Sequence, residues 1–152
     1  MRAIIESLNG QFEKIDLRQR ALLNGTDEVK LFWTPVPVAD SMITLSVGGS
    51  ILRSAAMVEQ VFLGMTRRLW DDPFEWTLPE KLSTRAAIKD YLDEVRETRQ
   101  AGLDFLKSDD DLARMLPAPE ALKPIGDVLF EALAKASRHL GTAEAILKLH
   151  AS

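Results

Sequence analysis

Residues 51–69, ILRSAAMVEQVFLGMTRRL, carry the clearest helical pattern in this chain. Apolar side chains recur along it at alternating intervals of four and three residues, which places them on one face of an α-helix. The stripe consists of Ile51, Ala55, Val58, Phe62, Met65 and Leu69. Helices with this spacing pack into bundles, so we expect residues 51–69 to present an inner face to neighbouring helices.

Three other segments carry the same helical period. The first covers residues 2–23 and ends before Asn24 and Gly25, which tolerate the left-handed conformation that ends helices. The third begins after Ser83 or Thr84, and the fourth runs over residues 125–149. The expected inward residues are Ile4, Leu8, Phe12, Ile15 and Leu22 in the first, Ile88, Tyr91 or Leu92, Val95, Leu103 and Leu106 in the third, and Ile125, Leu129, Ala132, Ala136, Ala143 and Ile146 in the fourth. We therefore predict an all-α four-helix bundle that forms a single domain over residues 1–152.

The connections carry signals for where the helices begin. Asp40 or Ser41 can cap the second helix, because a short side-chain oxygen accepts hydrogen bonds from its free N–H groups. Gly48 and Gly49 each lower helix propensity by about 1 kcal/mol relative to alanine. They indicate a late start, a kink or close contact with another backbone. Residues 108–124 are predicted to form a polar loop, and no strand pattern competes with the helices.

Composition narrows the classes of function. The 152 residues carry a net charge of −4 and include no cysteine. An acidic chain disfavours nonspecific binding to DNA or anionic lipid, and the lack of cysteine excludes disulfides, thiolate metal sites and cysteine nucleophiles. No apolar run reaches the length of about 18 residues that spans a membrane, and the N-terminal residues turn polar at once, unlike a signal peptide. We therefore expect a cytoplasmic protein that binds neither nucleic acid nor membrane.

Three motifs add a resemblance to a known family. They are WTPVP at residues 33–37, the helical residues 51–63 with Glu59 followed by Phe62, and SRHLG at residues 137–141. Together with four helices and a long connection between the second and third, they resemble the DinB/YfiT-like superfamily of four-helix bundles. This resemblance implies a divalent metal, often nickel or zinc, held by three histidines. One comes from the second helix, and two, four residues apart, come from the fourth.

The histidine content departs from the family pattern. The chain contains only His139 and His150. By the resemblance, His139 matches the later histidine of the fourth helix, and Lys135 stands where the earlier one would. The candidate positions on the second helix are Gly48, Ser50 and Ser54. The three-histidine site cannot form within this chain, so we expect a degenerate site without the family metal and without a cofactor.

Aromatic residues point to a ligand pocket near His139. Trp33, Trp70, Phe74 and Trp76 flank the second helix, where they form either a lid over the core or the wall of an apolar pocket. Lys135 and His139 would supply its polar groups. Because a lysine replaces a metal ligand, we expect the pocket to accept a small anion such as a carboxylate. The candidate ligand-binding residues are His139, Lys135, Ser54, Glu59, Trp33 and Trp76.

Other functions stay open at this point. An enzyme would be a metal- or thiol-dependent transferase or hydrolase with a non-standard site, in which Glu59 and His139 act with Asp93 or Glu94. His150 is a poor ligand donor because helix termini fray. A purely structural or regulatory partner protein is the third hypothesis. The small alanines of the fourth helix serve the bundle interior or a subunit interface, and together with the family resemblance they lead us to expect a homodimer.

Overall fold

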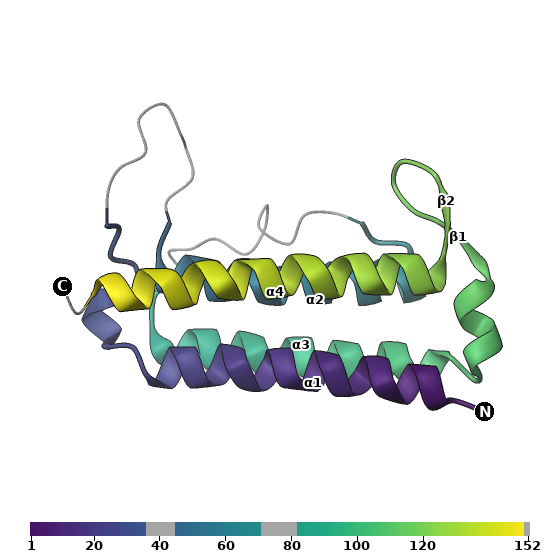
Figure 1. Ribbon diagram of the computed structural model, residues 1–152, viewed down its shortest axis with the longest axis horizontal. Helices are drawn as coiled ribbons and strands as arrows, with labels where there is room; N and C mark the ends of the chain where they lie inside the picture. Colours follow the sequence, from purple (N-terminus) through teal and green to yellow (C-terminus); the bar gives the residue numbers. More distant parts are fainter. Residues whose placement is uncertain (36–44, 71–81, 151–152) are drawn as a thin grey trace.

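The computed structural model describes residues 1–35, 45–70 and 82–150, and most of these residues are helical (Figure 1). The long helices are α1 (Ala3–Asn24), α2 (Val47–Arg67), α3 (Arg85–Phe105) and α4 (Ile125–Leu149). Short 3-10 turns follow α1 and α3, namely η1 (Glu28–Lys30) and η4 (Asp109–Ala113). A small antiparallel hairpin pairs β1 (Met115–Pro117) with β2 (Leu122–Pro124) directly before α4. The prediction of an all-α chain with four helices is confirmed.

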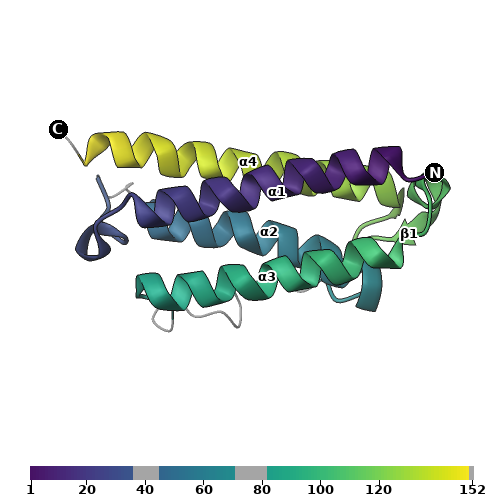
Figure 2. The ribbon, with the colours of Figure 1, turned by 90° about the horizontal axis from the view of Figure 1, so that it is seen from below.

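The four helices lie side by side in two layers, with α4 beside α2 and α1 beside α3 (Figures 1 and 2). Helices α2 and α3 run in the same direction, whereas α1 and α4 both run opposite to them. Ion pairs fix the antiparallel register of α1 and α3, since Arg99 contacts Glu13 and Arg20 contacts Asp93. Because α2 and α3 are parallel, the end of α2 and the start of α3 lie at opposite ends of the bundle, which accounts for the length of the connection over residues 68–84.

Helix α2 begins at Val47, where Ser46 caps it and Gly48 lies against the backbone of Leu31. The Ser46 hydroxyl accepts a hydrogen bond from the Gly49 N–H at 3.0 Å. The Gly48 N–H donates to the Leu31 carbonyl at 2.7 Å, and a Cβ on Gly48 would lie only 2.9 Å from that oxygen. A late start and close contact with another backbone are thus both present. The predicted caps Asp40 and Ser41 lie outside the described residues.

Two other helix starts use side-chain oxygens. Thr84 caps α3 as predicted, since its hydroxyl accepts the Ala87 N–H at 3.1 Å. Asp109 caps α1 from the far end of the sequence, and its carboxylate accepts the N–H groups of Ile4 and Ile5 at 3.0 to 3.1 Å. The expectation of a featureless loop over residues 108–124 is therefore wrong. This segment contains η4, which supplies the α1 cap, and the β1–β2 hairpin.

The core follows the predicted stripes with two corrections. Ile4 is 51% exposed and Ile5 is buried in its place, because Ile5 lies three residues before Leu8 and seven before Phe12 on the buried face of α1. Leu69 is also exposed, since α2 ends at Arg67 and the left-handed backbone of Arg68 (φ 57°) turns the chain away. The remaining stripe of α2 is buried, and the Phe62 ring packs edge-on against Phe12 at 5.2 Å between centroids.

The alanine stripe of α4 serves the bundle interior. Ala132, Ala136 and Ala143 are all buried, and α4 makes its most extensive packing against α2. Small side chains allow these two helices to approach closely. This stripe is therefore not available as a subunit interface, and the homodimer stays a prediction. None of the described helices has the length and apolar character needed to cross a membrane.

Candidate functional site

A cleft of about 150 Å³ lies between α2, α4 and the β1–β2 hairpin. We call this feature the hairpin cleft. Its apolar walls come from α2, from Trp70 just after that helix, from the loop between β1 and β2, and from the first turns of α4. The apolar lining residues are Met57, Val61, Trp70, Ala118, Pro119, Val128 and Ala132. The polar lining residues are Gln60, Glu120, Lys123, Glu131 and Lys135.

Trp70 is held in the hairpin cleft by three contacts. Its ring lies against Gly64, where an added Cβ would come within 2.4 Å of Cε3. The indole Nε1–H donates to the Pro117 carbonyl of β1 at 3.1 Å, and the Trp70 carbonyl accepts from the Gln60 amide at 2.9 Å. These bonds tie the end of α2 to the hairpin, so the aromatic wall is fixed in place before any ligand arrives.

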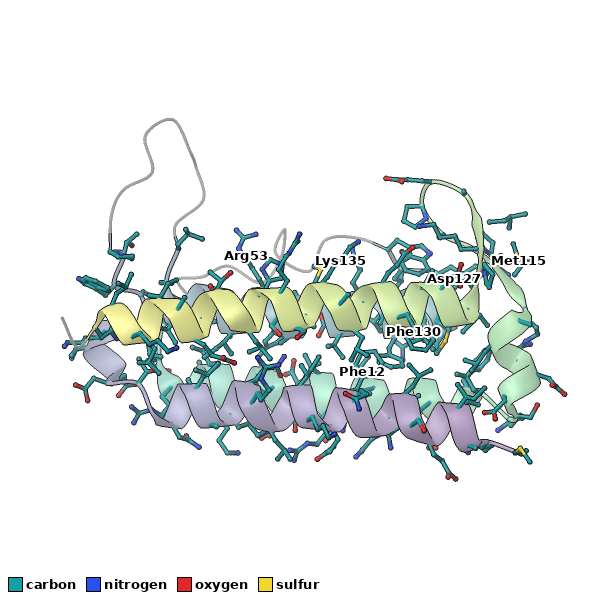
Figure 3. All side chains as sticks on the ribbon, in the orientation of Figure 1. Phe12, Arg53, Met115, Asp127, Phe130 and Lys135 are labelled. Atoms are coloured by element: carbon teal, nitrogen blue, oxygen red, sulfur yellow. The ribbon has the colours of Figure 1, made fainter. Side chains whose placement is uncertain are left out.

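The charges of the cleft divide into a paired and an unpaired set. Lys123 of β2 and Glu131 of α4 form an ion pair at 3.2 Å. Lys135 and Glu120 make no ion pair with any residue in the described ranges. Figure 3 shows Lys135 on the side of α4 that faces away from α1. Its ammonium is therefore available to a ligand that enters the cleft from outside the bundle.

His139 lies one helical turn beyond Lys135 and does not line the hairpin cleft. The side chain is half-buried. Burial lowers its pKa below the ordinary value of 6.5, and the positive charges of Arg138 and Arg53 lower the pKa further. The imidazole is therefore mainly neutral near pH 7. It can accept or donate a hydrogen bond there, but it adds little positive charge to attract an anion.

Ser54 lies in the core, where both of its hydrogen-bonding roles are occupied. The hydroxyl donates to the Ala136 carbonyl at 2.8 Å and accepts from the Gln19 amide at 3.0 Å. This buried network ties α1, α2 and α4 together. The structure therefore places Ser54 in a structural role, away from the hairpin cleft.

Glu59 is buried at the contact between α2 and α3. Glu59 is only 6% exposed, and its Oε1 atom has no hydrogen-bond partner within the described part of the chain. The pKa of Glu59 is raised from 4.5 to about 7, chiefly by burial and also by the negative charge of Glu94, while a hydrogen bond from the Tyr91 hydroxyl partly offsets the increase. The groups around Glu59 come from α3, so the structure does not bring it to Lys135.

The predicted aromatic residues separate in space. The Trp33 ring packs edge-on against His150, with 4.9 Å between their centroids, and neither side chain lines the hairpin cleft. His150 therefore has a packing partner at the end of α4, and its expected weakness as a ligand donor stays a prediction. Phe74 and Trp76 lie outside the described residues. Of the predicted ligand-binding residues with a described position, Lys135 is the one that the structure places in the cleft.

The geometry does not assemble a metal site from the predicted substitutes. Glu59 faces Tyr91 and Glu94, whereas the charges that act on His139 are those of Arg53 and Arg138. Asp93 is engaged by Lys89 and Arg20. Over residues 1–35, 45–70 and 82–150, no three histidine or acidic side chains gather closely enough to hold a metal ion.

Comparison with protein-family models, curated proteins and solved structures gives no match to this chain. The structure by itself defines an all-α protein of four helices with a partly apolar, partly charged cleft. Sequence reasoning identified Lys135 and Trp70 but missed Gln60, Glu120 and Lys123. The hairpin that brings the last two to the cleft is too short to produce a strand pattern in the sequence.

Proposed function

We propose that this protein binds a small organic ligand with an apolar body and a carboxylate, and that the hairpin cleft is its site. The observation that carries the proposal is that Lys135 and Trp70 line the same cleft. Sites for small molecules combine apolar and aromatic walls with a few polar groups that orient the ligand. The hairpin cleft has both elements.

The size of the cleft limits the ligand. A cavity near 150 Å³ accommodates a ring of about the size of benzene in another protein. Met57, Val61 and Val128 form an apolar surface beside Trp70, on which such a ring would rest. A carboxylate at the edge of the ring would meet Lys135. A monocyclic aromatic or short branched carboxylate therefore fits this site best.

The family resemblance supports the same proposal. The long connection between α2 and α3 is the feature on which the DinB/YfiT-like resemblance rests, together with the sequence motifs. Lys135 stands where a second histidine of the family's fourth helix would lie, so a cation would be repelled where an anion is attracted. We retain a degenerate metal site, a cytoplasmic location and a homodimer as parts of this proposal. A monomer at all concentrations in light scattering would exclude the homodimer.

An enzyme with a non-standard site is the second hypothesis, and it has less support. It requires Glu59 and His139 to act on one reactant, but the groups that surround Glu59 and those that surround His139 lie on different helices. Metal analysis of untagged protein distinguishes this hypothesis from the first. A stoichiometric metal that is lost in His139→Ala would favour the enzyme.

Titration with 3-phenylpropanoate, followed by ¹H–¹⁵N NMR, tests the proposed ligand class. At about 0.3 kcal/mol per non-hydrogen atom, a modest ligand efficiency, the roughly eleven such atoms of this acid contribute about 3 kcal/mol, so the expected Kd is on the order of a few mM. We expect the Trp70 indole N–H resonance to shift, because the ring lines the cleft. The neutral amide of the same acid should bind more weakly.

Two variants identify the site of binding. Lys135→Met removes the ammonium but keeps an apolar stem, and we expect it to weaken 3-phenylpropanoate binding. Lys148→Met, on the same helix and outside the cleft, is the matched control and should bind like the unmodified protein. Equal binding by both variants, or no shift at Trp70, would contradict the proposed function.

A further inference from the structure

The hairpin cleft offers two available charges of opposite sign. Four charged residues of the described ranges line it, of which Lys123 and Glu131 neutralise each other through their ion pair. Lys135 and Glu120 remain, and neither forms an ion pair with another described residue. The described part of the lining is therefore neutral as a whole, with one cation and one anion that a ligand could contact.

The two available charges come from different structural elements. Lys135 lies on α4, one helical turn after Glu131. Glu120 lies in the loop between β1 and β2, where the Ala118 N–H donates to the Ala121 carbonyl at 3.0 Å and closes the turn. The cleft thus has a positive charge on α4 and a negative charge on the hairpin. The apolar wall that includes Trp70 lines the same cleft.

We infer that the ligand is a small zwitterion of the amino-acid class with an apolar or aromatic side chain. Its carboxylate would contact Lys135, its ammonium would contact Glu120, and its side chain would lie against Trp70. This inference rests on the proposed function and makes its ligand class more specific.

A ligand with both charges suits the cleft better than a simple anion. A monoanion would contact Lys135, make no attractive contact with the Glu120 carboxylate and give the occupied site a negative charge. The net charge of the whole chain, −4, adds to the repulsion of anions. A zwitterion leaves the occupied cleft neutral and satisfies both side chains.

Matched ligands test the inference. Phenylalanine carries both charges, 3-phenylpropanoate lacks the ammonium, and phenethylamine lacks the carboxylate. A second set uses 4-(aminomethyl)benzoate, whose charges lie farther apart, with 4-methylbenzoate and 4-methylbenzylamine. In at least one set, we expect the zwitterion to bind about two- to fivefold more tightly than either singly charged analogue, as exposed ion pairs are weak.

Variants assign the two contacts. Glu120→Gln should weaken binding of the preferred zwitterion by about two- to fivefold and leave binding of its carboxylate analogue unchanged or slightly tighter. Lys135→Met should weaken both. Glu97→Gln, which changes an acid on α3 outside the cleft, is the control and should change neither.

The outcomes separate this inference from the proposed function. If the carboxylate analogues bind at the Trp70 resonance as tightly as the zwitterions, and Glu120→Gln has no effect, the zwitterion is wrong and the anion site stands. If no carboxylate or zwitterion in either set shifts the Trp70 resonance, both the inference and the proposed function are wrong.

Discussion

The replacement of Glu59 by glutamine tests how the buried carboxyl affects stability. Glu59 is 6% exposed, and its pKa is raised from 4.5 to about 7, first by burial and then by Glu94. Between these pH values the folded protein keeps a proton that the unfolded chain releases. The folded state therefore binds more protons, and the free energy of unfolding falls as the pH rises.

The magnitude follows from the difference in pKa. At about 1.4 kcal/mol per unit of pKa, the change from 4.5 to about 7 corresponds to roughly 3 kcal/mol. The contribution is complete below pH 4.5 and is lost as the pH rises through 7. Glutamine resembles the protonated side chain and cannot ionise. We expect Glu59→Gln to match the unmodified protein near pH 4.5 and to be more stable by up to roughly 3 kcal/mol at pH 8.

Urea unfolding at 25 °C, followed by circular dichroism from pH 4.5 to 8.5, measures this difference. Comparing variant and unmodified protein at each pH cancels the effects of other titrating groups. Glu97→Gln, an exposed change on α3, should give a difference near zero at every pH. A stability difference for Glu59→Gln that does not grow with pH, or a variant less stable than the unmodified protein at pH 8, would show that Glu59 is not held protonated by burial.

Three other substitutions test the contacts around the core and the cleft. Gly64→Ala should destabilise the fold by about 1–3 kcal/mol and shift the Trp70 indole resonance, because the new Cβ overlaps the ring. An unchanged resonance would contradict the packing of Trp70 against Gly64. Asp109→Ala should cost about 1 kcal/mol in urea unfolding, since the first turn of α1 loses its cap; unchanged stability would show that water replaces the carboxylate. Ser54→Ala should lower the free energy of unfolding by about 1–3 kcal/mol in the same assay, because the buried Gln19 amide loses its acceptor. A variant of equal stability would show that this hydrogen bond does not stabilise the fold.

The helices could be predicted because their signals are local. A stripe such as Ile51, Ala55 and Val58 reveals a buried face through spacing alone, and Thr84 marks a helix start through its side chain. The features that could not be predicted depend on contacts between residues that are distant in sequence. Asp109 caps a helix whose first residue lies more than a hundred positions earlier, so no local pattern reports the contact.

The candidate site was predictable only in part for the same reason. Lys135 was identified through the family resemblance, and Trp70 through its place in an aromatic connection. Their meeting in one cleft depends on Gly64, which lets the indole lie flat on α2, and on Pro117, whose carbonyl holds it. Such contacts depend on how separate elements pack, which residue spacing does not encode.

The helical character of this protein, the approximate positions of its helices and the chemistry excluded by two histidines and no cysteine all follow from the amino-acid sequence. Helical periodicity and residue composition are properties of the chain, so they can be recognised without knowledge of packing. The parallel course of α2 and α3, the burial of Glu59 against α3 and the shared cleft of Lys135 and Glu120 emerge from the fold alone. Burial, pKa and the pairing of charges depend on neighbours brought together by folding, and these neighbours define the site.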